Sequence, residues 1–248
     1  MLIFAVAGIS TAGIFGPPQT VSREAGGLNT AIGYWHQQGN LTSVSEYTFR
    51  RNEIYSQVSY GGHNIWEVYG RIGVSDLKIS DAFRSVNSAT VTSGSDFTEN
   101  WKLFGTLGAK GFLPVNEIFG LGAFLQVNYY FNNFTGDVTG TDAGVPFAAD
   151  LKIQNMWDVN FGIGMQFTLP HKIKLYTGPY IYYAEAKANL SANIPGLEFG
   201  TGGVLLKNKA FAGGFIGADI PLAKGFHLNI EGRYSERLSL GAAVSYTY

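Results

Sequence analysis

Hydrophobic and polar residues alternate with a period of two along the segment 156–167. Trp157, Phe161 and Ile163 occupy one set of positions, and Asp158 and Asn160 occupy the other. Successive side chains of a β-strand point to opposite faces, so this pattern predicts a strand with one apolar face and one polar face. The segment is also about as long as the roughly 9–11 residues with which a tilted strand crosses the apolar part of a bilayer.

The same alternation recurs along most of the chain and predicts about ten strands. An unbroken series of similar strands favours one all-β domain, a single transmembrane antiparallel up-and-down β-barrel. The expected strands cover 28–38, 47–60, 65–79, 101–112, 118–131, 151–169, 173–186, 207–222, 226–235 and 238–248.

The connections between these strands alternate between tight and long. Tight turns are expected at 61–64, 113–117, 170–172 and 223–225, and long polar loops at 80–100, 132–150 and 187–206. In an up-and-down barrel the two kinds then lie at opposite ends. Bacterial outer-membrane barrels have short periplasmic turns and longer extracellular loops, so the pattern predicts that both chain ends are periplasmic.

Alternation alone does not decide which face is outside, because a soluble barrel of the lipocalin type turns its apolar side inward. Composition favours the membrane alternative. Only 14% of the residues are charged, against roughly 25% in soluble domains, and Gly, Asn, Gln and Ser dominate the polar face. Bulky aromatic residues lie on the apolar face near strand ends, where interfacial girdles form. The expected interface residues are Trp66, Trp101, Tyr129, Trp157, Phe167 and Tyr234.

The last strand places Leu240, Val244, Tyr246 and Tyr248 on alternate positions and ends the printed sequence on an aromatic residue. This ending resembles the assembly signal of small Gram-negative-type outer-membrane β-barrels, of the OmpA-like or opacity-like kind without a periplasmic domain. Those barrels usually end in Phe rather than Tyr. The resemblance implies export, insertion by the barrel-assembly machinery, and residence in the outer membrane in contact with its lipid and lipopolysaccharide.

The N-terminal residues form a separate segment. Residues 1–15 are apolar and rich in small residues but too short to cross a bilayer as a helix. They are interpreted as a signal-peptide remnant, although they lack a positively charged leader. The alternatives are an apolar N-terminal strand or a segment tucked into the barrel. Residues 16–27 contain Pro17, Pro18 and Gly26 and are expected to link this segment to the barrel at 28–248.

Charged residues on the polar face would point into the lumen of the barrel. The set contains both signs and comprises Glu53, Glu67, Arg71, Lys102, Lys110, Asp158, Lys174, Asp219, Glu231 and Arg233. Charges in a narrow lumen are costly unless paired, so one hypothesis is a structural network that ties the strands together. The other is the constriction of a small-solute pore, in which opposite charges set selectivity. A barrel of about ten strands should have a narrow or plugged bore.

The net charge and the cysteine and histidine content give no sign of nucleic-acid binding, metal binding or catalysis. The formal net charge is −1, which gives no support for nucleic-acid binding. The chain has no cysteine, and its four histidines show no catalytic or metal-binding spacing. We therefore expect no cofactor, no metal and no enzymatic activity. The sequence predicts an envelope-structural or surface-loop binding barrel, with a narrow low-conductance pore as the alternative.

Overall fold

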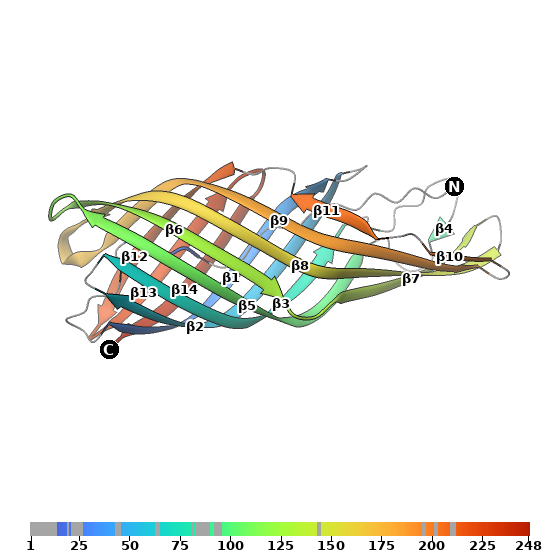
Figure 1. The fold of residues 1–248 in the computed structure, drawn as a ribbon, viewed down its shortest axis with the longest axis horizontal. Helices are drawn as coiled ribbons and strands as arrows, with labels where there is room; N and C mark the ends of the chain where they lie inside the picture. Colours follow the sequence, from blue (N-terminus) through green and yellow to red (C-terminus); the bar gives the residue numbers. More distant parts are fainter. Residues whose placement is uncertain are drawn as a thin grey trace.

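The computed structural model describes residues 14–18, 20, 27–42, 46–62, 65–80, 82, 90–91, 96–142, 145–194, 197–200, 203–208 and 212–248. Ten antiparallel strands close into a ring, which confirms the predicted fold (Figure 1). The ring strands are β1 (Leu28–Thr42), β2 (Glu46–Gly62), β3 (Trp66–Ile79), β5 (Phe97–Pro114), β6 (Phe119–Tyr130), β8 (Val145–Thr168), β9 (Lys174–Ile194), β12 (Ala212–Ala223), β13 (Phe226–Tyr234) and β14 (Leu238–Thr247). In the part of the chain that the structure describes, no helix is long and apolar enough to cross a membrane.

The first and last strands close the barrel. β1 pairs with β14 in one continuous register from Asn29 opposite Thr247 to His36 opposite Leu240. Every other ring strand pairs with its ring neighbours, including β8 with β9. The pairing of β1 with β14 therefore leaves the ring without a free edge. Its backbone N–H and C=O groups form their hydrogen bonds within the sheet, as a lipid environment requires.

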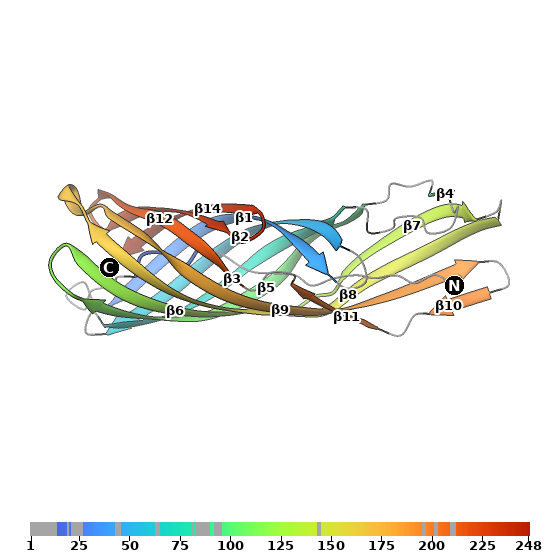
Figure 2. The same ribbon diagram turned by 90° about the horizontal axis from the view of Figure 1, so that it is seen from above.

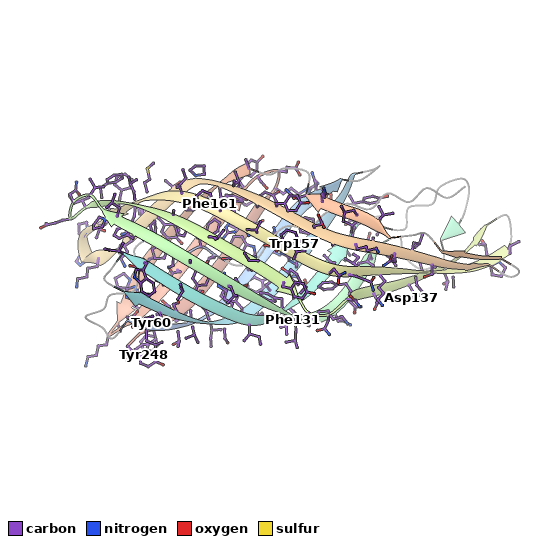
Figure 3. The ribbon with its side chains drawn as sticks, viewed as in Figure 1. Tyr60, Phe131, Asp137, Trp157, Phe161 and Tyr248 are labelled. Carbon is purple, nitrogen blue, oxygen red and sulfur yellow. The ribbon has the colours of Figure 1, made fainter. Side chains whose placement is uncertain are left out.

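The outer face of the ring is apolar. Leu107, Ile216 and Ile32 are 74%, 67% and 67% exposed, whereas Glu53 and Glu231 on the inner face are completely buried. In Figure 3 Phe161 points outward between two levels of aromatic residues, one with Tyr60 and Tyr248 and the other with Phe131 and Trp157. This inside-out arrangement excludes the lipocalin-type alternative and identifies a transmembrane barrel.

The four tight turns lie at one end of the barrel, which we call the short-turn end. β1 begins and β14 ends at the same end. A 3₁₀ turn, η2 (Pro170–Lys172), forms one of these connections and holds His171 at φ 62°. Which side of the membrane this end faces stays a prediction.

The opposite end, which we call the extended end, is a continuation of the sheet (Figures 1 and 2). The strands outside the ring are β4 (Thr90–Val91), β7 (Phe134–Asp142), β10 (Leu197–Gly200) and β11 (Val204–Asn208). β7 pairs with the first part of β8, and β11 bridges β1 and β9. The expectation of loops at 132–150 and 187–206 was therefore wrong for most of their length.

A change in polarity explains why strands were mistaken for loops. Above the membrane-spanning part, Phe134 and Val138 of β7 are buried inside, while Thr135 and Asp137 are exposed. These outer positions are polar because they face water, so the segment has the composition of a loop. A cluster of buried apolar residues fills the interior, including Phe49, Leu77, Ile79, Phe97, Phe134, Val138, Leu151, Ile153 and Leu206.

The described part of the N-terminal segment lies inside the ring. Ile14 and Phe15 are only 4% and 1% exposed. They contact the middle of the lumen, whereas Pro18 approaches Gly122 nearer the short-turn end. These residues therefore occupy the lumen, one of the alternatives considered for the segment 1–15. Residues 1–13 lie outside the described part of the chain, and cleavage of a signal peptide stays a prediction.

Candidate functional site: the lumen

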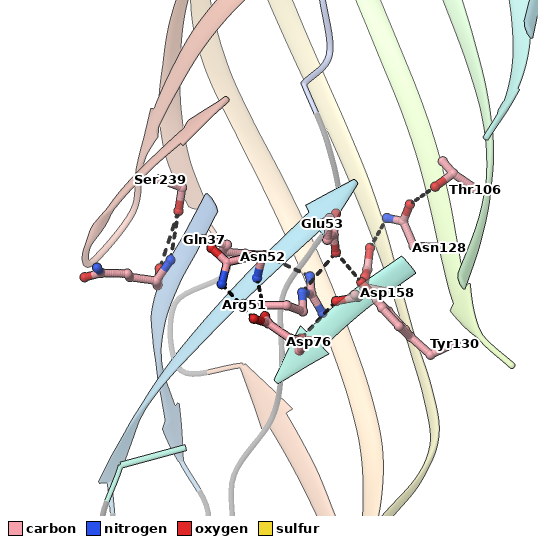
Figure 4. Close-up of polar contacts among 12 residues, drawn as sticks. Gln37, Arg51, Asn52, Glu53, Asp76, Thr106, Asn128, Tyr130, Asp158 and Ser239 are labelled. Carbon is pink, nitrogen blue, oxygen red and sulfur yellow. Dashed lines mark hydrogen bonds and ion pairs between the residues drawn. The ribbon is translucent and has the colours of Figure 1, made fainter. Parts of the chain in front are cut away.

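The lumen contains a layer of buried polar residues beneath the extended end. The Nε atom of Arg51 lies 3.0 Å from Oε1 of Glu53, and both side chains are fully buried. The Tyr130 hydroxyl donates a hydrogen bond to the same Glu53 oxygen at 2.8 Å. The Arg51 guanidinium also lies over the Tyr130 ring at 4.8 Å. These contacts join β2 to β6 across the lumen (Figure 4).

Asp158 continues this layer toward β5. It accepts hydrogen bonds from the side-chain amides of Asn128 and Asn160. Asn128 in turn accepts a bond from the Thr106 hydroxyl at 2.6 Å. Buried carboxylates lose their hydration, and such donors compensate the loss. The layer, which we call the Arg51 layer, consists of Arg51, Glu53, Thr106, Asn128, Tyr130, Asp158 and Asn160.

A second group of polar residues surrounds the N-terminal segment. Arg71 donates to Gln57 at 2.6 Å and to Gln126 at 3.1 Å. Its guanidinium also lies 4.7 Å from the centre of the Tyr55 ring. Glu231 accepts hydrogen bonds from Arg233 at 2.8 Å and from the Tyr176 hydroxyl at 3.2 Å. Each charged side chain in this part of the lumen therefore has polar partners.

Phe15 fills an aromatic pocket in the middle of the lumen. Its ring stacks on Phe124 at 5.2 Å and meets Phe215 edge-on at 5.2 Å. Tyr180 lies 5.9 Å away in a similar edge-on arrangement. The guanidinium carbon of Arg233 lies 3.7 Å from the centre of the Phe15 ring. A ring surrounded in this way is held by both apolar and cation–π contacts.

Between this pocket and the short-turn end lies a cavity of about 400 Å³. Two ion pairs line it, Lys110 with Glu67 and Lys174 with Asp219, each with an N to O distance of 3.2 Å. The Nδ1 atom of His227 lies 3.2 Å from the Asp219 carboxylate. Phe15, Gly16 and Pro17 form the inner wall of the cavity. The cavity therefore lies against the N-terminal segment.

Most of the charged residues expected in the lumen are buried there. These are Glu53, Glu67, Arg71, Lys110, Asp158, Asp219, Glu231 and Arg233. Lys174 keeps 16% of its side chain exposed, and Lys102 keeps 29%. Lys102 lies apart from the Arg51 layer and contacts Glu99 at 3.5 Å. The functional role of the whole set stays a prediction.

Sequence reasoning missed two components of the lumen. Arg51 is two positions before Glu53 on the same face of β2, so strand alternation alone could have assigned it. No sequence pattern could have placed Phe15 in the lumen, because its pocket is built from β6, β9, β12 and β13. Only the folded barrel brings those strands around it.

The aromatic residues expected at the interface lie on the outer face at two levels. Trp66 and Phe167 lie toward the short-turn end, where they contact Tyr60 and Phe119 respectively. The level toward the extended end contains Trp101, Tyr129, Trp157 and Tyr234, all exposed or partly exposed. Leu240, Val244, Tyr246 and Tyr248 also lie on the outer face, where Tyr246 packs against Phe226 at 4.7 Å.

The histidines are dispersed over the barrel. His36 lies on the outer part of β1 and hydrogen-bonds with Asn52 and Gln38 at 2.8 and 3.1 Å. His171 is in the η2 turn, His227 contacts Asp219, and His63 lies outside the described residues. Among the residues that the structure describes, no group of three or more histidine, cysteine or acidic side chains could hold a metal ion.

The chain is similar in fold to known membrane barrels. It matches the translocator domain of the autotransporter NalP from Neisseria meningitidis with a TM-score of 0.50 and 12% identity, covering 90% of this chain and 88% of that one. It also matches the outer-membrane protease OmpT from Escherichia coli (TM-score 0.44, 12% identity, 89% and 96% covered). A COG4313 outer-membrane channel from Pseudomonas putida F1 gives a TM-score of 0.36 at 11% identity, with 97% and 100% covered.

Comparison with protein-family models found no match, and a search of curated proteins found none. At these low identities the likeness to solved structures establishes the fold alone. Together with the exposed apolar belt, it defines the class of the protein: a transmembrane β-barrel of the outer-membrane type.

Proposed function

We propose that this protein is a non-enzymatic outer-membrane β-barrel with a closed lumen, whose role is structural or lies in binding at its extended end. The observation that carries the proposal is the apolar cluster inside that end. Leu77, Ile79, Phe97, Ile153 and Leu206 are completely buried there. A path for ions or polar solutes needs water or polar groups, and a packed apolar interior supplies neither.

Two further features support a closed lumen. The Arg51 layer joins side chains from β2, β5, β6 and β8 beneath the apolar cluster. Phe15 occupies the lumen on the other side of this layer. Closure at several levels fits a barrel of about ten strands, whose bore is narrow before any insert is added.

The extended end supplies the surface for binding. The outer face of β7 and of the neighbouring part of β8 carries exposed Thr135, Asp137, Thr139, Asp150 and Lys152. The apolar cluster stiffens this sheet from within. Binding sites are often found on segments that a rigid scaffold holds beyond its surface.

Electrical recordings in planar bilayers test the closed lumen. We expect well-folded protein, checked by its resistance to unfolding in detergent on heating, to give no discrete current steps at any salt concentration. Current steps that scale with salt would contradict the proposal and support the second candidate.

The second candidate is a narrow, low-conductance pore. The cavity of about 400 Å³ favours it, because ion-paired and polar residues line the cavity between Phe15 and the short-turn end. A pore further requires that Phe15, the Arg51 layer and the apolar cluster all move aside. The same recordings therefore separate the two candidates.

We also propose that the barrel is inserted by the barrel-assembly machinery and contacts membrane lipid and lipopolysaccharide. Tyr246 near the end of β14 and the exposed Tyr248 that follows it support recognition of the last strand. Tyr248→Ala should reduce the amount of folded protein in the outer membrane while leaving refolding in detergent unchanged. Equal membrane levels of the two proteins would contradict this role.

A further inference from the structure

The contacts of Phe15 describe a complete recognition site. Both oxygens of Glu231 accept backbone hydrogen bonds, from the N–H of Phe15 and from the N–H of Gly16, each at 3.0 Å. Nη2 of Arg71 donates to the carbonyl oxygen of Ile14 at 2.6 Å. The site thus binds the peptide groups on both sides of Phe15 as well as its ring.

The residues that make these contacts are built into the barrel wall. Glu231 is 0% exposed, and Arg71 and Arg233 are 6% and 3% exposed. A buried carboxylate gains much from two N–H donors, because charge-assisted hydrogen bonds are short and strong. Without the segment, Glu231 would keep Arg233 and Tyr176 but lose both of these donors.

The barrel wall also leaves room for the ring. Gly162 faces Phe15, and a Cβ atom there would lie 3.4 Å from the Phe15 ring and 3.3 Å from Tyr180. A larger side chain at this position would enter the space of the ring. Pocket size, ring contacts and backbone donors therefore agree on a single aromatic residue flanked by two peptide groups.

We propose that the middle of the lumen is a specific binding site for an aromatic residue flanked by two peptide groups, and that Phe15 of the same chain occupies it. The site recognises an acyl oxygen through Arg71, two successive N–H groups through Glu231, and an aromatic ring through Phe124, Tyr180, Phe215 and Arg233. Recognition resides in the barrel wall and does not depend on covalent linkage to the segment. This inference is independent of whether the barrel conducts.

N-acetyl-L-phenylalaninamide is a suitable probe, because it carries these groups and little else. Its acetyl oxygen corresponds to the Ile14 carbonyl, and its two amide nitrogens to those of Phe15 and Gly16. In full-length Phe15→Ala the ring pocket is vacated, so the probe has only the backbone of residues 14–16 to displace from Arg71 and Glu231. We expect millimolar probe to raise the melting temperature of this variant in detergent and to leave that of the wild-type protein unchanged.

Two controls isolate the ring and the pocket. N-acetylglycinamide has the same peptide groups without the ring and should bind at least about tenfold more weakly. Phe15→Ala combined with Gly162→Val fills the ring pocket without altering a charge, and it should lose the response to the probe. An equal response of wild type and Phe15→Ala, or no response of Phe15→Ala, would overturn the proposal.

A second measurement does not depend on the stability of Phe15→Ala. The native chain has no cysteine, so Ile14→Cys provides a single thiol next to the site. Val115→Cys is its control in an exposed turn. In the folded full chain the Ile14→Cys thiol should react with a maleimide at least about tenfold more slowly than the control. Equal rates would show that the segment does not occupy the lumen.

The intact mass of protein isolated from outer membranes tests occupancy by the chain itself. A mass that includes Phe15 supports the proposal. A mature chain that begins after Phe15 would overturn occupancy by this segment, whatever the response of Phe15→Ala to the probe.

Discussion

Gly108 illustrates how a single residue permits the close packing of the lumen. It lies directly opposite Tyr69 in the pairing of β3 with β5, and a Cβ atom at this position would overlap the Tyr69 ring. The ring has little freedom to move, because its hydroxyl donates to Gln126 and Arg71 lies 4.8 Å from its centre. Glycine is therefore required here for space.

We expect Gly108→Ala to lower the free energy of unfolding by about 1–3 kcal/mol, the usual cost of overpacking. Urea unfolding in detergent measures this. Gly70→Ala is the matched control, because the nearest atom to a Cβ there is 3.9 Å away. Similar losses for both variants would show that glycine is not needed for the Tyr69 ring.

Arg51 and Glu53 are a case in which removing one partner should cost more than removing both. Arg51→Met leaves Glu53 buried without its cation and should destabilise the barrel by about 3–5 kcal/mol. Arg51→Met combined with Glu53→Leu should recover much of that loss. Lys78→Met, which breaks the exposed ion pair of Lys78 with Asp96, should cost at most about 1 kcal/mol. Unfolding in urea compares all three, and equal losses from the Arg51 and Lys78 substitutions would contradict the argument.

Sequence alternation located most of the charged lumen residues individually but gave none of their partners. Glu53 accepts a hydrogen bond from Tyr130 of β6, and Asp158 accepts one from Asn128 of the same strand. These contacts depend on which strands face each other across a closed ring. Strand periodicity contains no information on that point, so the network had to come from the structure.

Among the elements, β8 has one part that crosses the membrane and another that extends beyond it. Most of its large apolar residues occupy odd positions, including Leu151, Ile153, Trp157 and Phe161. β8 contains a β-bulge between Gln154 and Trp157, where one extra residue is inserted relative to β9 and Asn155 has a φ of 50°. Because of this extra residue, the side chains that point inward before the bulge are at odd positions, and those that point inward after it are at even positions. The same series of odd positions therefore faces the apolar cluster before the bulge and lipid after it.

A similar irregularity lies between β3 and β5, beside Trp101. Both bulges thus occur next to tryptophans at the membrane boundary. A bulge has no reliable sequence signal, and continuing the alternation of β8 would place Leu151 and Ile153 in lipid. This explains why the membrane-spanning strands were predictable and their extension was not.

The exchange of faces predicts opposite responses to charge on a single strand. Phe161→Arg introduces a cation in the bilayer and should cost about 2–4 kcal/mol. Asp150→Arg lies on the outer face of the same strand beyond the bulge and opposite Asp137. It should be neutral or slightly stabilising, because it relieves a like-charge pair. Unfolding from lipid vesicles measures both, and comparable losses would contradict the assigned boundary.

Glu99 gives the extended end a defined response to acid. Hydrogen bonds from the backbone and hydroxyl of Thr135, at 2.8 and 2.9 Å, lower the pKa of Glu99 below its usual 4.5 despite the opposing effect of burial. A lowered pKa in the folded state means that the contact stabilises β5 against β7 above the ordinary pKa. This stabilisation is lost as the pH falls through the folded value.

The amide proton shift of Thr135 should therefore be constant at neutral pH and titrate with a midpoint below 4.5. The signal reports the hydrogen bond directly, because this N–H donates to the Glu99 carboxylate. In Glu99→Gln the shift should be independent of pH. A midpoint above 4.5 in the native protein would contradict the assigned contact.

The whole molecule has its closures arranged in series along one axis. From the short-turn end these are the Phe15 pocket, the Arg51 layer and the apolar cluster of the extended end. The sequence predicted a narrow bore from the number of strands, and this expectation required no knowledge of individual contacts. It could not predict that apolar residues fill the extended end, because part of them, including Phe97, Phe134 and Leu206, was assigned to loops.

Closures in series make a stringent prediction for Phe15→Ala. Removing the ring enlarges the cavity but leaves Arg51 paired with Glu53, and Leu77 and Ile153 packed above them. Current through a series of barriers is set by the most restrictive one, so we expect Phe15→Ala to be as silent in planar bilayers as the wild-type protein. The probe response proposed above verifies that the pocket is vacated in the same preparation. Current steps in Phe15→Ala, suppressed by N-acetyl-L-phenylalaninamide, would instead mean that Phe15 is the sole closure and that the barrel is a plugged pore.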